Sequence, residues 1–278
     1  MKFGDFEIKT FVEQRFKLDG GSMFGVVPKT MWQKFVTPDE NNRIDYVTNL
    51  FLLKANGKNI LFETGFGDTI SEREKKVYAI TEENNLTNGL HTLGVTEDDI
   101  DYVILTHLHT DHMAGGLKFE DGRYLPRFPN ATYITSEEEY NVALNPNERT
   151  AAVYIPDRIS ALKDSGKLEF IGRNEKLFDG IHTVHCGGHT EGIFALEFES
   201  GNQKLYYYSD LFMSSYYMKT AYIPATDLYP LDSMAIKRKK LPELINEDII
   251  LAYCHDPNHR FVKVNEVDNK IVLEDIEN

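Results

Sequence analysis

Short hydrophobic runs separated by polar turns recur along the chain and predict many β-strands. The runs 46–53 and 59–63 flank Lys54–Lys58, whose Asn-Gly pair between apolar segments is typical of a β-hairpin. Farther along, Asp101–Thr106 has the composition of a buried strand and runs directly into His107. Further strands are predicted at 132–135, 167–171, 181–185, 193–199, 204–209, 248–253, 261–264 and 271–274.

Helices are predicted between these runs. The segment that follows the polar stretch 71–85 is expected to form a helix ending near Leu93-Gly94, where the glycine can cap the last turn. Other helices are predicted at 136–144, 151–165 and 232–240. Two β-rich halves with helices around them indicate an α/β protein with two facing sheets between helical layers, a four-layer αββα sandwich.

The chain shows no sign of a domain boundary. Its length alone would allow about two domains, but no internal repeat, low-complexity tract or Pro/Ser-rich linker divides it. We therefore expect residues 1–278 to form one domain. Within it, residues 1–45 are expected to form an N-terminal arm that contributes to a substrate pocket or to a dimer contact.

Composition narrows the classes of partner. The chain carries 30 basic and 44 acidic side chains, and its net charge of −14 repels phosphate backbones and anionic lipid surfaces. No apolar run approaches the roughly 20 residues of a membrane-spanning helix. Acids occupy the N-terminus where a signal peptide has an apolar core, and two cysteines are too few for a disulfide framework. We expect a cytoplasmic protein that binds neither nucleic acid nor membrane.

The segment HLHTDH, from His107 to His112, places three imidazoles and one carboxylate within six residues. His107 and His109 leave a predicted strand, so their rings can converge on one ion. Asp111 and His112 start the next turn and point at a neighbouring position. Such ligands suit Zn²⁺, Fe²⁺ and Mn²⁺. Without a metal these groups would be hard to satisfy when buried and would repel one another when protonated.

Six residues cannot complete two metal sites, and three further candidates follow predicted strands. His189 lies in a glycine-flanked loop, Asp210 comes after the strand 204–209, and His255 comes after the strand 248–253. A carboxylate at Asp210 could bridge two ions. Because sites are commonly built on loops at strand ends, this arrangement predicts a dinuclear centre. We expect zinc, with iron, manganese or cobalt as alternatives.

The order of these motifs resembles that of the metallo-β-lactamase superfamily: HxHxDH, then Gly-His-Thr, an aspartate after a strand, and a late histidine. The resemblance covers nearly the whole chain and includes Leu61–Gly67. Within the superfamily the chain is most similar to the quorum-quenching N-acyl-homoserine lactonases, through Gly20–Lys29, Trp32 and His255-Asp256-Pro257. The resemblance implies the metallo-β-lactamase fold and a metal-dependent hydrolase that opens the lactone ring of N-acyl-homoserine lactones.

The resemblance also assigns the metal ligands. His107, His109 and His189 would hold the first metal, Asp111, His112 and His255 the second, and Asp210 would bridge the two.

Three positions depart from the lactonase pattern. Glu63 stands where the family more often has Asp before Thr-Gly. This puts in doubt whether the residue supports the ligand histidines from behind, as the family pattern implies. Met213 occupies a position where some lactonases have a catalytic tyrosine. Glu191 replaces a frequent proline, a change expected to affect only its loop.

Water is the expected nucleophile, because the chain has no Gly-x-Ser-x-Gly elbow and neither cysteine lies in a nucleophile motif. In this hypothesis a hydroxide bridging the metals attacks the lactone carbonyl. The catalytic residues are then Asp111, Asp210 and Tyr222. Asp111 would orient the hydroxide or carry its proton, and Tyr222 would stabilise the oxyanion.

Substrate selection is expected to come from apolar loops that form a channel for an acyl chain. The candidates are Met23, Phe24, Val26, Trp32, Phe66, Tyr216 and Tyr217. Tyr216 and Tyr217 are also alternatives to Tyr222 as oxyanion donor, and simple aromatic packing is the other explanation for all three. For the N-terminal members, a structural arm or a homodimer contact is an equal alternative.

Other hydrolases of the superfamily remain alternatives: a glyoxalase II-like thioesterase, a β-lactamase or a phosphoesterase. Glutathione and phosphate substrates need a cationic pocket, which an acidic chain with one short basic run at 237–240 supplies poorly. A flavodiiron-type oxygen reductase would carry a carboxylate at position 109, so His109 favours hydrolysis. The complete ligand set argues against a non-catalytic scaffold. The acid excess favours a neutral small molecule such as an acyl lactone.

Overall fold

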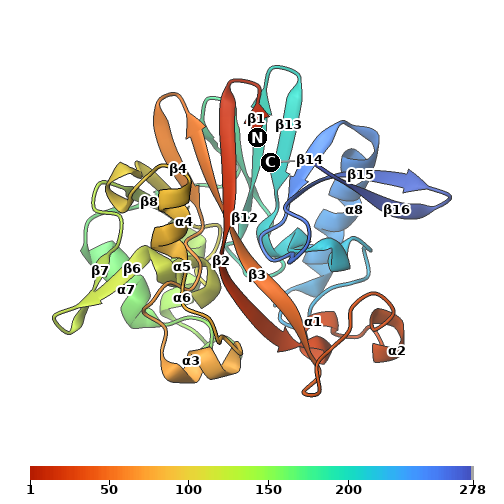
Figure 1. Cartoon of the computed structure of the whole chain (residues 1–278), viewed down its shortest axis with the longest axis horizontal. Coiled ribbons are helices and arrows are strands. Elements are labelled where there is room, and N and C mark those ends of the chain that lie inside the picture. The colour runs from red at the N-terminus through yellow and green to blue at the C-terminus, as the bar shows by residue number, and fades with distance from the viewer. Residues whose placement is uncertain (277–278) are drawn as a thin grey trace.

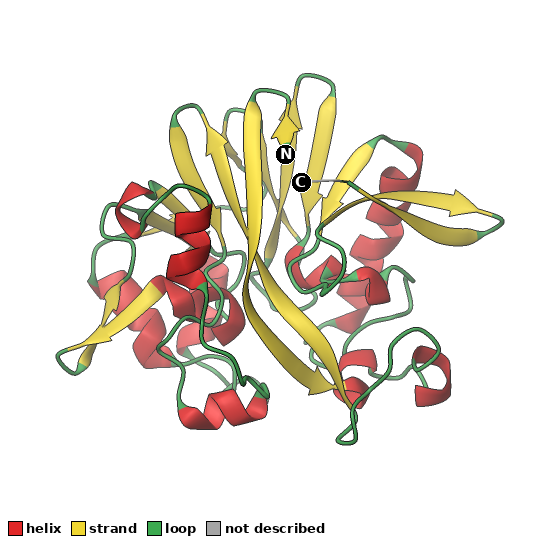
Figure 2. Ribbon diagram, in the orientation of Figure 1, coloured by secondary structure: helices red, strands yellow, loops and turns green. Residues whose placement is uncertain are grey.

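The computed structural model describes residues 1–276, which contain two seven-stranded β-sheets with helices on either side (Figure 1, Figure 2). The first sheet consists of β1 (Lys2–Phe3), β2 (Phe6–Asp19), β3 (Arg43–Ala55), β4 (Lys58–Phe62), β5 (Tyr102–Ile104), β8 (Thr132–Ser136) and β9 (Leu168–Ile171). The second consists of β10 (Lys176–Phe178), β11 (Ile181–His185), β12 (Phe194–Ser200), β13 (Gln203–Tyr207), β14 (Ile249–Ala252), β15 (Phe261–Val267) and β16 (Lys270–Asp275). A separate hairpin joins β6 (Leu117–Glu120) and β7 (Arg123–Pro126).

In each sheet the strands lie side by side in the order in which they are given above. The neighbours β4, β5, β8 and β9 run parallel, as do β13 and β14, whereas the other pairs are antiparallel. Parallel strands end at the same edge of a sheet. The loops after β4, β5 and β8 therefore meet at one edge of the first sheet, and the loops after β13 and β14 meet at one edge of the second.

The two sheets pack face to face through aromatic side chains. Phe62 of β4 stacks on Phe198 of β12 with ring centroids 5.2 Å apart, and Phe51 of β3 meets Tyr207 of β13 at 5.6 Å. All four side chains are buried. These contacts form the centre of the hydrophobic core, as expected for two sheets that each bury one face.

Helices cover the outer faces of this pair of sheets. They are α1 (Gly20–Phe24), α2 (Lys29–Trp32), α3 (Glu72–Val77), α4 (Leu86–Thr92), α5 (Thr110–Met113), α6 (Glu137–Leu144), α7 (Pro156–Asp164) and α8 (Pro230–Asn246). Helices α3 to α7 lie on the side of the first sheet, and α8 packs against β14 and β15 of the second (Figure 1). The predicted αββα sandwich is confirmed.

Most elements form where the sequence predicts them. β3 and β4 build the expected hairpin, with Asn56 and Gly57 at φ of 52° and 73°, the left-handed values of its turn. α4 ends at Thr92, and Gly94 follows with a φ of 79°. The local sequence was sufficient to predict this turn and this helix end, because each depends on a residue that tolerates positive φ.

Two predicted helices have different bounds. The helix expected at 151–165 begins only at Pro156, because proline favours the first helical turn and forces Ile155 before it into an extended conformation. The helix expected at 232–240 extends over Pro230–Asn246 and contains Pro242. Packing of its buried face, including Leu244, offsets the hydrogen bond that this proline cannot donate.

Residues 1–45 contain β1, β2, α1 and α2. β2 pairs with β3 from Glu7 to Asp19, so it is an integral strand of the first sheet, and the sequence did not predict it. The two short helices follow at its end (Figure 1). Among residues 1–276, no helix combines the length and apolar character that crossing a bilayer requires.

Candidate metal centre

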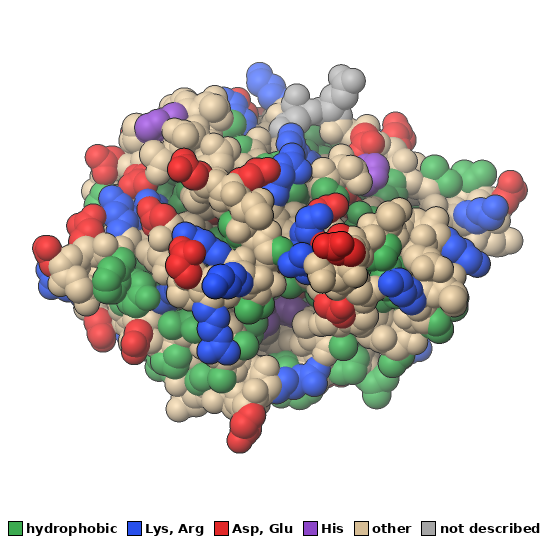
Figure 3. Space-filling model, turned by 60° about the horizontal axis from the view of Figure 1, so that its bottom comes forward, with side chains coloured by type: hydrophobic (Ala, Val, Ile, Leu, Met, Phe, Trp, Pro, Cys, Tyr) green, Lys and Arg blue, Asp and Glu red, His purple; other side chains and the backbone are tan. Residues whose placement is uncertain are grey.

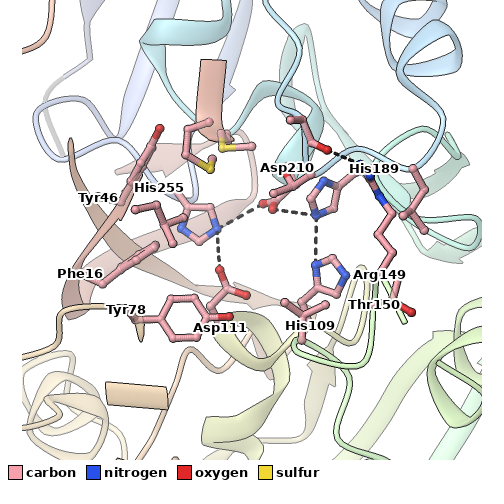
Figure 4. Close-up of a pocket in the computed structure, with 17 residues that line it drawn as sticks. Phe16, Tyr46, Tyr78, His109, Asp111, Arg149, Thr150, His189, Asp210 and His255 are labelled. Carbon is pink, nitrogen blue, oxygen red and sulfur yellow. Dashed lines mark hydrogen bonds and ion pairs between the residues drawn. The ribbon is translucent and has the colours of Figure 1, made fainter. Parts of the chain in front are cut away.

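The side chains that the sequence predicts as metal ligands meet at the facing ends of the two sheets (Figure 4). The first sheet supplies His107 and His109 from the loop after β5, and Asp111 and His112 from α5. The second supplies His189 from the loop between β11 and β12, Asp210 from the turn after β13, and His255 from the loop after β14. Among the described residues, four groups of potential ligands have one ligand atom from each member within 4.8 Å of the others: His107, His109 and His189; Asp111, His112 and His255; His107, His112 and Asp210; and Asp210, Cys254 and His255.

Asp210 lies between the two halves of this cluster. Its Oδ1 is 3.2 Å from Nε2 of His112 and 3.2 Å from Nε2 of His255. Its Oδ2 is 3.2 Å from Nε2 of His189 and 3.9 Å from Nε2 of His107. One carboxylate oxygen therefore faces each half, which is the placement that a bridging ligand needs.

The donor set fits divalent cations. Within residues 1–276, Nε2 of His107 is buried without a hydrogen-bond partner and lies 3.9 Å from Oδ2 of Asp210. Nδ1 of His109 approaches Nε2 of His189 to 3.1 Å. In addition, Nε2 of His255 approaches Nε2 of His112 to 3.0 Å. Buried imidazole nitrogens without a partner are costly unless another group satisfies them. Ions held by nitrogen and carboxylate ligands would satisfy these atoms together.

Electrostatics separate the histidines into two kinds. Burial and the neighbouring imidazoles lower the pKa of His107 and His109 well below its usual value, so both keep a free lone pair. Burial also opposes charge on His112, but the carboxylates of Asp210 and Asp111 outweigh it and raise its pKa to about 10. The carboxylates thus attract positive charge to the centre of the cluster, where divalent ions would supply it.

Buried carboxylates orient two of the histidines. Asp227 lies 2.9 Å from Nδ1 of His189 and also accepts a hydrogen bond of 2.5 Å from Ser233. Glu63 lies 3.6 Å from Nδ1 of His112 and accepts a 2.5 Å hydrogen bond from Thr106. Such outer partners fix ring orientation and raise ligand basicity. The glutamate that departs from the lactonase pattern therefore still stands next to a ligand histidine.

A third buried carboxylate joins the loops that carry the ligands. Glu139 accepts hydrogen bonds from the Leu108 amide at 2.9 Å, the Tyr154 hydroxyl at 2.7 Å and the Thr190 hydroxyl at 2.6 Å. It therefore connects the HLHTDH segment with the loop of His189. Burial raises the pKa of Glu139, and these hydrogen bonds oppose that rise. The sequence did not reveal this role, because an acid in the first turn of a helix is common without one.

A cavity of about 240 Å³ opens onto the cluster. Its floor contains His109, Asp111, His189, Asp210 and His255, and its walls are Phe16, Leu18, Met23, Tyr46, Tyr78, Arg149, Thr150, Val153, Met213, Ala225, Thr226 and Leu228. In the space-filling view, histidine side chains are visible at the bottom of a hollow near the middle of the face (Figure 3). The cluster is thus buried yet reachable by a small molecule.

The predicted substrate-binding residues occupy different places. Met23 lines the cavity. Phe24, Trp32 and Tyr217 stack on one another outside the cavity, with Phe24 5.0 Å from Trp32 and 5.7 Å from Tyr217 between ring centroids. Val26 is 93% exposed and points away from the core.

The remaining predicted aromatic residues are also outside the cavity lining. Phe66 is buried against the ring of Tyr78 at 4.7 Å, one layer behind the wall. Tyr216 is half-buried, and Tyr222, predicted as a catalytic residue, packs against Phe35 at 6.1 Å. The sequence missed most of the actual lining, because these residues come from distant segments and no local pattern marks them.

Comparisons with known proteins agree with this geometry. Residues 43–233 match the sequence profile of the Metallo-beta-lactamase superfamily. The N-acyl homoserine lactonase AiiB of Agrobacterium fabrum is 26% identical over 182 residues, which cover 58% of this chain and 63% of that protein. The chain therefore matches less than two thirds of the length of this curated relative.

Solved structures of other proteins superpose over the whole chain. A probable metal-dependent hydrolase from Staphylococcus aureus has a TM-score of 0.90 at 29% identity, with 100% of both chains covered. AidC, a dizinc quorum-quenching lactonase in complex with a product, N-hexanoyl-L-homoserine, has a TM-score of 0.83 at 21% identity. That superposition covers 100% of this chain and 96% of AidC. At this identity the second similarity concerns the fold alone.

Proposed function

The chain belongs to the metallo-beta-lactamase superfamily, and from this premise we propose that it is a dinuclear metal-dependent hydrolase that opens the lactone ring of N-acyl-homoserine lactones. The observation that carries the proposal is the small cavity of mostly apolar walls that opens directly onto Asp111, Asp210 and His255. The lactonase names of the relatives agree with this substrate class.

The ligands would hold two divalent ions, zinc being the first choice, and Asp210 would bridge them. Such ions supply Lewis acidity and lower the pKa of bound water toward neutrality. The chain's own residues then orient the reactants. Asp111 lines the cavity, and its Oδ2 lies 3.7 Å from Nε2 of His255. Its carboxylate is therefore close enough to the centre to take the proton of the attacking water and carry it to the leaving oxygen.

The walls favour a small substrate with an uncharged body. Apart from Arg149, the residues above the cluster are apolar or carry neutral polar groups. A volume of about 240 Å³ is smaller than the roughly 300–1,000 Å³ that ligand sites usually span. We therefore propose short acyl chains as the preferred substrates. The proposal includes a cytoplasmic location, with which the two free, buried cysteines agree.

The experiment is turnover of acyl-homoserine lactones with chains of about 4 to 12 carbons by zinc-loaded protein, with a thioester, a β-lactam and a phosphotriester as comparisons. Lactones with short chains should be the best substrates by kcat/KM. Asp210→Asn should lower this value by at least about 100-fold and reduce the metal content. Faster turnover of another substrate class would overturn the substrate assignment, and full activity of metal-free protein would overturn the chemistry.

A further inference from the structure

Two phenols line the cavity, and they use their hydroxyl groups differently. The hydroxyl of Tyr46 lies 2.6 Å from the hydroxyl of Tyr217, a residue outside the cavity lining. The hydroxyl of Tyr78 has no hydrogen-bond partner among residues 1–276, although the residue is only 6% exposed. The hydroxyl oxygen of Tyr78 is not among the buried polar atoms that lack a partner, so it is open to the cavity and can bond a ligand there.

Tyr78 is held rigidly. Its amide donates a 2.9 Å hydrogen bond to the carbonyl of Glu74 in α3, and its carbonyl accepts a 2.8 Å bond from the amide of Lys17 in β2. Its ring meets Phe66 edge-on at 4.7 Å and Phe16 at 6.1 Å. Contacts from α3, from β2 and from the loop after β4 therefore hold the ring in place. The side chain does not have to reorganise when a ligand binds.

The hydroxyl of Tyr78 stands beside the acidic side of the metal centre. Figure 4 places its ring next to Asp111 at the edge of the cavity. A phenol is protonated at neutral pH, so Tyr78 can donate a hydrogen bond to a ligand in the cavity.

We propose that Tyr78 is a catalytic residue that donates a hydrogen bond to the substrate oxygen on which negative charge develops during ester hydrolysis. Preorganised donors of this kind stabilise charge strongly in a cavity that excludes water. The proposal rests on the hydrolase function above, but it requires only a carbonyl substrate and no particular lactone. Tyr78 thereby takes the role of oxyanion donor that was predicted from the sequence for Tyr222.

The geometry favours Tyr78 over the other tyrosines. Tyr216, Tyr217 and Tyr222 do not line the cavity. The hydroxyl of Tyr217 is engaged by Tyr46. Among residues 1–276, Tyr78 is thus the phenol that both lines the cavity and keeps its hydroxyl unengaged.

The test is Tyr78→Phe, which removes one oxygen and keeps the packed ring. We expect kcat to fall about 10- to 100-fold while KM changes less than about threefold, because the donor acts mainly on the charged transition state. Metal content and thermal midpoint should equal those of the wild type. The zinc-loaded variant should also bind the anionic acyl-homoserine product several-fold more weakly in a calorimetric titration.

Tyr46→Phe is the matched comparison, because it removes the other phenol oxygen from the same wall. Its loss in kcat should be clearly smaller than that of Tyr78→Phe. Equal losses in both variants, or a Tyr78→Phe variant with kcat within about threefold of wild type, would overturn the proposal. A thermal midpoint that falls along with kcat would assign Tyr78 a purely structural role and overturn it as well.

The two proposals fail separately. If the wild type cleaves a thioester or an aryl ester but no lactone, the lactonase function fails, and Tyr78 is tested on the substrate that is cleaved. If the wild type cleaves lactones and Tyr78→Phe does so equally well, only the role of Tyr78 fails. If no carbonyl substrate is cleaved by the metal-loaded protein, both are overturned.

Discussion

At the scale of single residues, buried carboxylates divide into those that face the metal centre and those that hold the surrounding loops. Asp210 faces both halves of the centre, whereas Glu63, Glu139 and Asp227 each bond to a loop or ligand nearby. In the sequence, the last three look like any other acids among 44. Burial distinguishes them, because a buried carboxylate must find partners.

Glu13 is a buried carboxylate outside the centre. It is 1% exposed and accepts hydrogen bonds from Thr48 at 2.5 Å and from the Gly67 amide at 2.9 Å. Burial dominates over these bonds and raises the pKa of Glu13 from 4.5 to about 7. Glu13 thus connects β2 to the loop that leads from β4 toward the metal centre.

Glu13 should make stability depend on pH. The pKa of Glu13 is 4.5 in the unfolded chain and about 7 in the folded protein. Between these two pH values the folded protein keeps a proton that the unfolded chain has released. The free energy of unfolding should therefore fall by about 3 kcal/mol as pH rises through this range, and Glu13 should add no slope below or above it. In Glu13→Gln this part of the slope should disappear when urea unfolding is compared at pH 4.5, 6 and 8.

The control for this measurement is Glu266→Gln, at an exposed position of β15. It should show the same pH slope as the wild type. If stability depends on pH as steeply in Glu13→Gln as in the wild type, Glu13 is not the source of this pH dependence.

At the scale of elements, turn chemistry was more informative than hydrophobic periodicity. The Asn-Gly hairpin between β3 and β4 was predicted. Asp121-Gly122 between β6 and β7 is a second signal of the same kind, although neither of these two strands was predicted. β2 alternates buried and half-buried residues from Phe6 to Thr10, but a bulge between Val12 and Gln14 then shifts its register. No single alternating pattern therefore spans the whole strand, and the sequence did not predict it.

Small residues allow α5 and the turn that follows it to approach the loop after β4. A Cβ atom on Gly115 would lie 2.0 Å from the carbonyl oxygen of Thr64 and 3.2 Å from the amide of Gly67. The Thr64 hydroxyl donates a 2.9 Å hydrogen bond to the carbonyl of His112. Displacing this loop would therefore also disturb His112, a predicted metal ligand.

Gly115→Ala is expected to lower the free energy of unfolding by about 1–3 kcal/mol, because backbone rather than a flexible side chain must move. Zinc affinity, measured by competition with a chelator, should fall as well. Gly172→Ala is the matched control, since its Cβ would meet only the end of the Glu175 side chain. Equal effects of the two substitutions would argue against a close backbone contact at Gly115.

At the scale of the whole molecule, the metal centre lies across the boundary between the two sheets. The ligands from His107 to His112 follow the first sheet, whereas His189, Asp210 and His255 follow the second. Bound ions would connect the two halves of the sandwich. Because the unfolded chain does not assemble this site, the ions would stabilise the folded state.

Removing the metal should lower the thermal midpoint. At a free-metal concentration about 1,000 times the Kd, binding contributes about 4 kcal/mol, which for a chain of this size corresponds to roughly 10 °C. Differential scanning calorimetry of zinc-loaded protein with and without a chelator measures this shift, and added zinc should restore the midpoint. The thermal midpoint of Asp210→Asn should change much less when the chelator is added. Identical midpoints with and without chelator would exclude a metal that links the sheets.

The sequence by itself was enough to predict the class of fold and the set of side chains that gather into the candidate metal centre. Metal coordination requires a few residue types at short spacings. His107, His109, Asp111 and His112 have this composition and spacing within six consecutive residues. Only the tertiary structure decided what surrounds the centre. The cavity walls come from segments as distant as Phe16 and Leu228, and whether a tyrosine faces the cavity depends on the side chains packed behind it. Such packing is cooperative and leaves no local pattern, so the position of Tyr78 could not be predicted from the sequence.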